Sequence, residues 1–307
     1  MAAVNKAEGY HQPVLLKEAV DGLNIKPNGI YVDVTFGGGG HSREILKRLD
    51  KEGRLYAFDQ DPEAKRNVID DARFTLIDQN FGNMKNWLRL AKVTKVDGIL
   101  ADLGVSSHQF DSEERGFSIR FDAPLDMRMD MQRKQTAADV VNNYADEQLL
   151  QIMRQYGEVD NAKGIVRSIT NARPINTSGE LKDALQRHLI RGKEHKVLAQ
   201  VFQALRIEVN EELVVLKNML EQSASLLTES GRLVVISYHS LEDRLVKDFM
   251  RSGNFEGESN KDFFGNLLRP LKPLSGKPIL PSEEEINRNN RARSAKMRIA
   301  IKLKEEK

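Results

Sequence analysis

The sequence predicts an α/β fold built on a mostly parallel sheet, interrupted by a helical domain. Short apolar runs alternate with amphipathic segments over the first hundred residues, which is typical of successive β-α-β units. This alternation stops near residue 105 and resumes near residue 211, and the stretch between them has only helical periodicity. We therefore expect residues 1–105 and 211–307 to form one discontinuous α/β domain, with residues 106–210 as an inserted all-helical domain.

Four successive glycines follow the first expected strand. Residues 30–32 form an apolar run that suits a buried strand, and helical spacing begins at Ile45, so the glycines lie in the turn between the two elements. Glycine suits such a turn because it tolerates positive φ and lets a ligand approach the backbone closely. No lysine follows Gly40, which disfavours a P-loop, and Ser42 stands where a dinucleotide fingerprint needs its third glycine.

An acid at the strand end followed by spaced glycines resembles the first motif of the S-adenosylmethionine (SAM) methyltransferases. Asp33 is the acid, and Gly37 and Gly39 hold the spaced positions. A plain glycine turn is the alternative, but four glycines in succession carry a high cost in chain entropy. A nicotinamide oxidoreductase is a second alternative, and the missing third glycine disfavours it.

Acidic residues also end the next three expected strands. The strands and their terminal acids are residues 54–59 with Asp59, residues 73–78 with Asp78, and residues 96–102 with Asp102. Asp59 follows the glycines by about 20 residues, where an acid in a β-α-β unit typically binds a ribose diol. Ligands of open α/β sheets bind at the carboxyl ends of the strands, so these acids predict a site there. Phe81 follows the third strand and either stacks on a cofactor base or packs beneath a loop.

The rest of the α/β domain has weaker signals. The other expected elements are a helix over residues 11–23, a helix opened by Asp61, a long helix marked by Leu213 and Leu227, a strand over residues 231–237, a loop over residues 252–293 and a half-buried strand over residues 296–303. His239 and Ser240 follow the fifth strand. Ser240 with Asp243 indicates a helix start, while His239 lies where it would reach a substrate.

Charge is unevenly distributed along the chain, whose net charge is only +2. Residues 161–206 contain nine basic against three acidic side chains, and residues 286–307 contain eight against two. Two basic regions on an otherwise acidic chain indicate a polyanionic partner, although solvated helix faces explain each region alone equally well. The expected contacts to such a polyanion are Arg187, Arg191, Lys193 and Lys196 in the insert, and Arg291 and Arg293 near the C-terminus.

Several classes of protein are disfavoured. The sequence has no cysteine, which excludes disulfides and thiolate metal sites and fits a cytoplasmic location. The six histidines lack metal-ligand spacing, so we expect no metal. No apolar run is long enough to span a membrane, so we expect no membrane partner, and no Gly-x-Ser-x-Gly supports a serine hydrolase.

A set of longer motifs resembles the bacterial ribosomal RNA small subunit methyltransferase H family, of the MraW type. The motifs are His11-x-Pro13-Val14-Leu15, Asp33 to Ser42, Asp102 to Ser107, Glu114 to Ser118, Pro124 to Met129, Phe202 to Ile207, Tyr238 to Arg244 and Ala292 to Ala295. The resemblance implies a class I, Rossmann-like SAM-methyltransferase sheet with an inserted helical domain. It also implies that SAM methylates the exocyclic N4 of a cytidine in the decoding region of 16S rRNA, within the small ribosomal subunit. The cofactor residues it implies are Gly39, Gly40, His41, Asp59, Phe81, Asp102 and Gln109.

Asp102 is the first candidate for the catalytic acceptor. Enzymes that methylate base amines commonly place an acid or asparagine after the fourth strand, followed by two prolines and an aromatic residue. Here Asp102-Leu103-Gly104 keeps the acid but lacks the aromatic residue. His239 and Ser240 are the alternative acceptors, and Phe117, Phe121, Tyr238 and His239 are unranked candidates to sandwich the cytosine. A protein that only binds RNA, or a ribosome assembly factor, is the rival interpretation.

Overall fold

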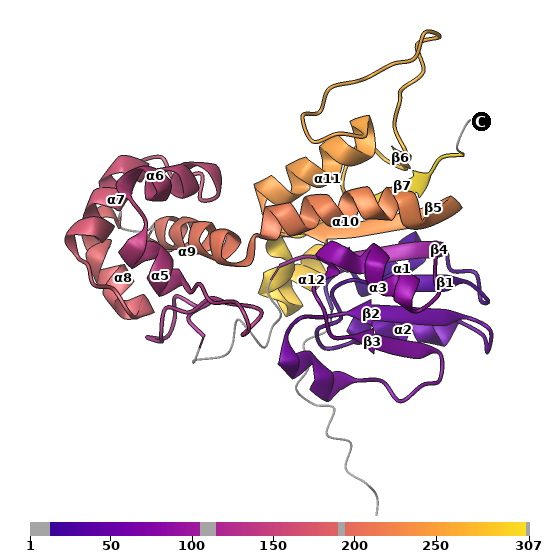
Figure 1. Cartoon of the computed structure of the whole chain (residues 1–307), viewed down its shortest axis with the longest axis horizontal. Helices are drawn as coiled ribbons and strands as arrows, with labels where there is room; N and C mark the ends of the chain where they lie inside the picture. The colour runs from indigo at the N-terminus through magenta and orange to yellow at the C-terminus, as the bar shows by residue number, and fades with distance from the viewer. Residues whose placement is uncertain (1–12, 105–114, 190–193, 305–307) are drawn as a thin grey trace, which may run out of the picture. The chain divides into compact units, whose positions relative to one another are not determined.

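The structure, a computed structural model, describes residues 13–104, 115–189 and 194–304, which belong to two compact units (Figure 1). The first, called the α/β unit below, comprises residues 1–104 and 214–307, and the second, the helical unit, comprises residues 105–213. Each unit has its own apolar core.

A seven-stranded sheet forms the centre of the α/β unit, in the strand order β3-β2-β1-β4-β5-β7-β6. The strands are β1 (Ile30–Asp33), β2 (Arg54–Phe58), β3 (Phe74–Ile77), β4 (Val96–Asp102), β5 (Leu227–Ser237), β6 (Leu271–Pro273) and β7 (Lys296–Lys302). Strands β1 to β5 are parallel, and β7 is antiparallel to both β5 and β6. This order, with one reversed strand, confirms the prediction of a class I methyltransferase sheet.

Helices cover both faces of the sheet, because successive strand residues point to opposite sides and both sides are apolar. The helices are α1 (Leu16–Gly22), α2 (Gly40–Arg48), α3 (Met84–Leu90), α10 (Glu212–Leu226), α11 (Ser240–Ser252) and α12 (Glu283–Arg288), with 3-10 turns η1 (Pro62–Asn67), η2 (Phe81–Asn83) and η4 (Asn290–Ser294). In β4, Ile99 packs in the cluster with Leu88 and Leu220, whereas Leu100 packs in the opposite cluster with Val20 and Ile45.

Several expectations for the α/β unit need correction. The first helix begins at Leu16 rather than residue 11, and the preceding Leu15 has a left-handed φ of 51°. Asp61 caps the next element as expected, but that element is a 3-10 helix. Strand β5 begins at Leu227, although the leucine spacing predicts that this residue belongs to the long helix. The expected loop over residues 252–293 contains β6 and α12, which are too short to show periodicity.

The last strand is buried on both faces, not on one. Met297 and Ala300 are fully buried on opposite faces of β7, in different apolar clusters. The reason is its position between β5 and β6, where helices cover both sides of the sheet.

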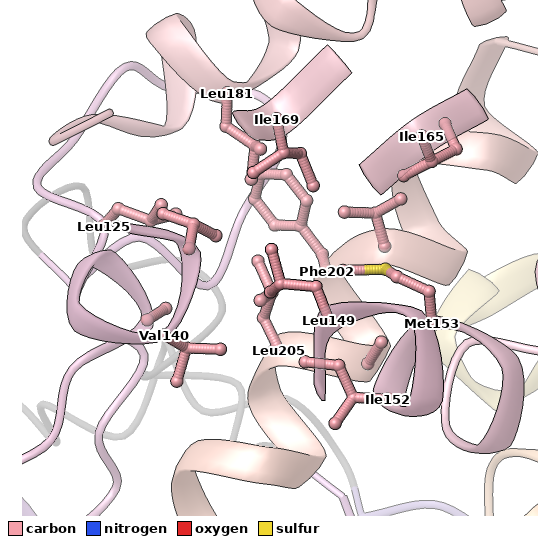
Figure 2. Close-up of a cluster of buried hydrophobic side chains, with 14 of the residues drawn as sticks. Leu125, Val140, Leu149, Ile152, Met153, Ile165, Ile169, Leu181, Phe202 and Leu205 are labelled. Carbon is pink, nitrogen blue, oxygen red and sulfur yellow. The ribbon is translucent and has the colours of Figure 1, made fainter. Parts of the chain in front are cut away.

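The helical unit is organised around one apolar cluster, which Figure 2 shows. Its elements are α5 (Ala137–Asn143), α6 (Asp146–Gln155), α7 (Ala162–Asn171), α8 (Ser178–Ala184), η3 (Gln186–His188) and α9 (Glu194–Asn210). Leu149, Ile169 and Leu205 are fully buried members of this cluster. A capping box of Thr177 and Glu180 opens α8, with a hydrogen bond of 3.2 Å from the Glu180 amide to Thr177 Oγ1.

The irregular stretch that precedes these helices packs into the same core. Phe117, Leu125 and Met127 are buried in it, and the Arg115 side chain donates to the Met129 carbonyl at 3.0 Å. Phe117 is only 6% exposed, so it is a core residue rather than a platform for a base. Within the described parts of the chain, none of the helices is both long and apolar enough to cross a bilayer.

Candidate active site

The glycine turn between β1 and α2 combines positive φ angles with open space. Gly37 and Gly39 have φ of 50° and 73°, and the Gly39 amide donates to the Phe36 carbonyl at 2.7 Å. A Cβ at Gly37 would meet no atom within 4 Å, so the backbone there is open to a ligand. A Cβ at Gly40, by contrast, would lie 2.1 Å from Pro13 Cγ, so Gly40 is required for packing.

Asp33, at the end of β1, stabilises this turn through its carboxylate. The carboxylate is buried, with one oxygen accepting from Ser42 Oγ at 2.7 Å and the other from the Thr35 amide at 3.1 Å. Burial raises the pKa of Asp33, and the two hydrogen bonds oppose that rise. Asp33 therefore supports the glycine turn through its hydrogen bonds.

Asp59 joins the end of β2 to the glycine turn. One carboxylate oxygen accepts from the Gly37 amide and the other from the Asp61 amide, both at 2.8 Å. Burial raises the pKa of Asp59 to about 6, against the effect of these two hydrogen bonds. Each carboxylate oxygen can accept a second hydrogen bond, so the group is oriented and still able to bind a diol.

Asp102, at the end of β4, is held by residues from three other segments. Its Oδ1 accepts from the Tyr238 hydroxyl at 2.7 Å, and its amide donates to Thr35 Oγ1 at 2.7 Å. Its Oδ2 lies 3.8 Å from Nδ1 of His41, whose pKa burial lowers to about 4, so the imidazole is neutral at pH 7. Burial raises the pKa of Asp102 to about 7, and the bond from Tyr238 opposes the rise.

Thr35 links Asp33 and Asp102 into one network. Its amide donates to Asp33, and its hydroxyl accepts from the Asp102 amide. Gly104, with φ of 105°, lets the chain pass the Tyr238 ring, because a Cβ there would lie 3.2 Å from Tyr238 Cδ2. The sequence pattern did not single out Thr35, and it identified Tyr238 only as a stacking aromatic.

His239 and Ser240 differ from expectation. His239, not Ser240, is the N-cap of α11: its Nδ1 accepts from the Glu242 amide at 3.4 Å, and its Nε2 lies 3.2 Å from Glu242 Oε1. Asp243, the expected partner of Ser240, instead forms a bidentate ion pair with Arg298 at 2.6 and 3.1 Å. Nδ1 of His239 therefore caps the start of the helix, whereas Nε2 is buried without a hydrogen-bond partner among the described residues.

The structure brings most of the expected cofactor residues together. The glycine turn, His41, Asp59 and Asp102 are connected by the contacts above, at the carboxyl ends of β1, β2 and β4. Phe81, in η2, is half-buried against the apolar cluster beneath α3 and α10, which favours packing over a free face. Asp78 is exposed and pairs with Lys65, away from this network. Gln109 lies outside the described residues.

The expected RNA contacts are unequal in the structure. Lys196 in α9 and Arg293 in η4 are exposed, whereas Arg291 is half-buried. Arg187 is exposed, but its Nε donates to Ser168 Oγ at 2.8 Å within the helical unit. Arg206, counted in the first basic region, forms a bidentate ion pair with Glu212 at 2.7 and 2.8 Å. Arg191 and Lys193 lie outside the described residues.

Comparison with known proteins agrees with this geometry. The MraW methylase family matches residues 8–303. Three proteins named ribosomal RNA small subunit methyltransferase H are similar over almost their whole length. The protein of Christiangramia forsetii is 58% identical, and the match covers 96% of this chain and 98% of the relative. The protein of Cytophaga hutchinsonii is 60% identical, with 95% of this chain and 99% of the relative covered. The protein of Flavobacterium psychrophilum is 60% identical, with 94% of this chain and 100% of the relative covered.

These similarities confirm the predictions of the family, of an enzyme and of SAM as its methyl donor. A match over nearly all of the chain, on a class I sheet with an acid-lined glycine turn, leads to one conclusion: the chain belongs to the MraW methylase family.

Proposed function

We propose that this methyltransferase transfers the methyl group of SAM to the exocyclic N4 of a cytidine in the decoding region of 16S rRNA. The observation that carries this proposal is the Asp102 carboxylate at the end of β4, oriented by the Tyr238 hydroxyl, with the Asp102 amide hydrogen-bonded to Thr35 beside the glycine turn. The similarity to proteins named small subunit methyltransferases supports the RNA substrate. With such a substrate, the protein would act in the cytoplasm on the small ribosomal subunit.

The residues at the site suit SAM and an amine. The open backbone at Gly37 would admit the cofactor, and the Asp59 carboxylate would accept from its ribose hydroxyls. When bound, SAM supplies a methyl group on a sulfonium, a strong electrophile. The cytosine amine is a weak nucleophile because its lone pair is delocalised into the ring. Asp102 would accept a hydrogen bond from the amine, which localises that lone pair on the nitrogen. The enzyme would then mainly need to hold the nitrogen in line with the methyl group and the sulfur of SAM.

The cytosine must leave its stack to reach such a carboxylate, as bases do in other base-modifying enzymes. Basic side chains of the helical unit and of η4 would hold the RNA backbone, which fixes its position without reading sequence.

We expect methyl transfer to decline as the pH falls through about 7, because Asp102 accepts only as a carboxylate and burial raises its pKa to about 7. At pH 6 the rate should be roughly a tenth of the plateau. Tyr238→Phe should move this decline to higher pH, since the hydroxyl lowers the pKa of Asp102. Single-turnover rates at saturating SAM measure this, and a flat profile between pH 6 and 8 would contradict it.

Charge reversal at Lys196 or Arg293 should weaken RNA binding and leave SAM binding unchanged. Both side chains are exposed, and removing one phosphate interaction should flatten the salt dependence of affinity by about one unit in the log–log slope. Lys51→Glu is the control, because Lys51 is exposed in the loop before β2. That loop lies at the amino ends of the parallel strands, whereas the candidate site lies at their carboxyl ends. Titration of 16S rRNA fragments at several salt concentrations checks the slope. An equal loss in the Lys51 variant would show a non-specific charge effect.

The reaction itself is tested by incubating the protein with methyl-labelled SAM and unmodified ribosomal subunits. We expect label in small-subunit RNA and none in large-subunit RNA. Binding of the small subunit without transfer of label would support the rival role of an assembly factor.

A further inference from the structure

The segment between α11 and β6 displays two phenylalanines to solvent. Phe263 is 99% exposed and Phe264 is 86% exposed, more than any other large apolar side chain in the described parts of the chain. Leu268, nearby, is 59% exposed. Figure 1 shows this segment as the orange loop that extends away from the sheet of the α/β unit. Apolar side chains grouped in this way on a surface indicate a binding site.

The two rings stand on a turn with defined geometry. Asp262 Oδ1 accepts from the Phe264 and Asn266 amides, both at 2.8 Å, and the Asp262 amide donates to the Asn266 carbonyl at 2.9 Å. Gly265 has φ of 86°, and Lys261 and Leu267 form a β-bridge that closes the hairpin. The rings are therefore presented on an ordered turn, so little further ordering is needed when they bind.

The two rings are arranged edge to face. Their centroids are 5.7 Å apart and their planes are at 87° to each other, and exposed fractions of 99% and 86% leave each ring an accessible π-face. An aromatic face exposed in this way is the surface on which an unpaired nucleobase stacks.

From Lys261 onward the charge favours a polyanion as the occupant, while the exposed Glu256 and Glu258 precede the hairpin. Lys261, Lys272 and Lys277 are exposed on this segment and the chain that follows it. Asp262 is the one acid among residues 261–277, and hydrogen bonds within the turn engage its carboxylate. Aromatic side chains interleaved with lysines are the combination by which proteins bind single-stranded nucleic acid.

We propose that Phe263 and Phe264 stack on unpaired bases of the RNA substrate, while the neighbouring lysines contact its phosphates. This inference rests on the proposed function, because it takes ribosomal RNA as the substrate, and it adds an RNA contact on the α/β unit. Neither phenylalanine belongs to the apolar cores of that unit, so the contact can be removed without disturbing the fold.

The test compares three double variants at these two positions. Phe263→Ala with Phe264→Ala should weaken binding of a single-stranded fragment of the 16S rRNA decoding region about tenfold or more, with unchanged SAM affinity and thermal unfolding. Phe263→Trp with Phe264→Trp should restore binding, and its tryptophan fluorescence should be quenched by the RNA. Phe263→Leu with Phe264→Leu keeps an apolar surface without a π-face and should bind as weakly as the alanine variant.

Binding is measured directly, so the outcome does not depend on methyl transfer. Wild-type affinity in the alanine variant would overturn the inference. Full binding by the leucine variant would also overturn it, because the contact would then be a general apolar one. RNA binding that needs the two phenylalanines, in a protein that transfers no methyl group, would keep the inference and contradict the proposed reaction.

Discussion

Replacing Asp102 with asparagine should slow methyl transfer by about 100-fold or more, the usual scale for removing one electrostatic interaction from a transition state. The change is nearly isosteric, and the Tyr238 hydroxyl can still donate to the remaining oxygen, so the fold should survive. The amide, however, presents a donor where the carboxylate presents an acceptor, and it cannot localise the lone pair of the cytosine amine. SAM affinity should fall only modestly.

The measurement is single-turnover transfer at saturating SAM and RNA, which separates the chemical step from binding. Tyr238→Phe is the matched variant, because it removes the hydroxyl that orients the carboxylate but keeps the carboxylate itself. At high pH it should be much less impaired than Asp102→Asn. If Asp102→Asn reacted within a few-fold of wild type, Asp102 would serve only to place the cofactor.

Asp59→Ala should weaken SAM binding by about 1–3 kcal/mol, the range expected when a charged hydrogen-bond partner is removed. The carboxylate has two roles at once, since it would bind the ribose diol and it accepts from the amides of Gly37 and Asp61. Asp59→Asn retains one acceptor oxygen and should lose less affinity than the alanine variant.

Calorimetric titration of SAM measures both losses, and Asp78→Ala provides the control. Asp78 follows the neighbouring strand β3, but it is exposed and pairs with Lys65. Its removal should leave SAM affinity unchanged. If Asp59→Ala also bound SAM normally, Asp59 would have no part in the cofactor site.

The fold was predictable because its main elements carry strong local signals. Apolar strands that alternate with amphipathic helices, and a glycine turn after β1, indicate a parallel sheet without tertiary information. Strand β6 has only three residues, one of them Pro273, so it shows no alternation. Helix α12 did carry a sequence signal, the pair Ser282 and Glu285 at the spacing of an N-cap. In the structure the Ser282 side chain accepts from the Glu285 amide. The charged, loop-like composition around it obscured that pattern.

The candidate site was predictable in its location but not in its contacts. Asp33 and Asp59 were placed at strand ends by periodicity alone, yet periodicity does not say which oxygens the protein itself uses. The hydrogen bond from Tyr238 to Asp102 joins positions 136 residues apart, and its existence depends on how β5 lies beside β4. Serine is the commoner N-cap, so the sequence favours Ser240 in that role, but in the structure the imidazole of His239 takes it.

The most direct test of the proposed chemistry is the identity of the methylated nucleoside. Methyl-labelled SAM would be incubated with small ribosomal subunits that lack the modification, and the 16S rRNA would be digested and mapped. We expect the label in N4-methylcytidine at a single position of the decoding region, because Asp102 suits an amine. Label on a ring carbon, on a ribose or at scattered positions would contradict that assignment.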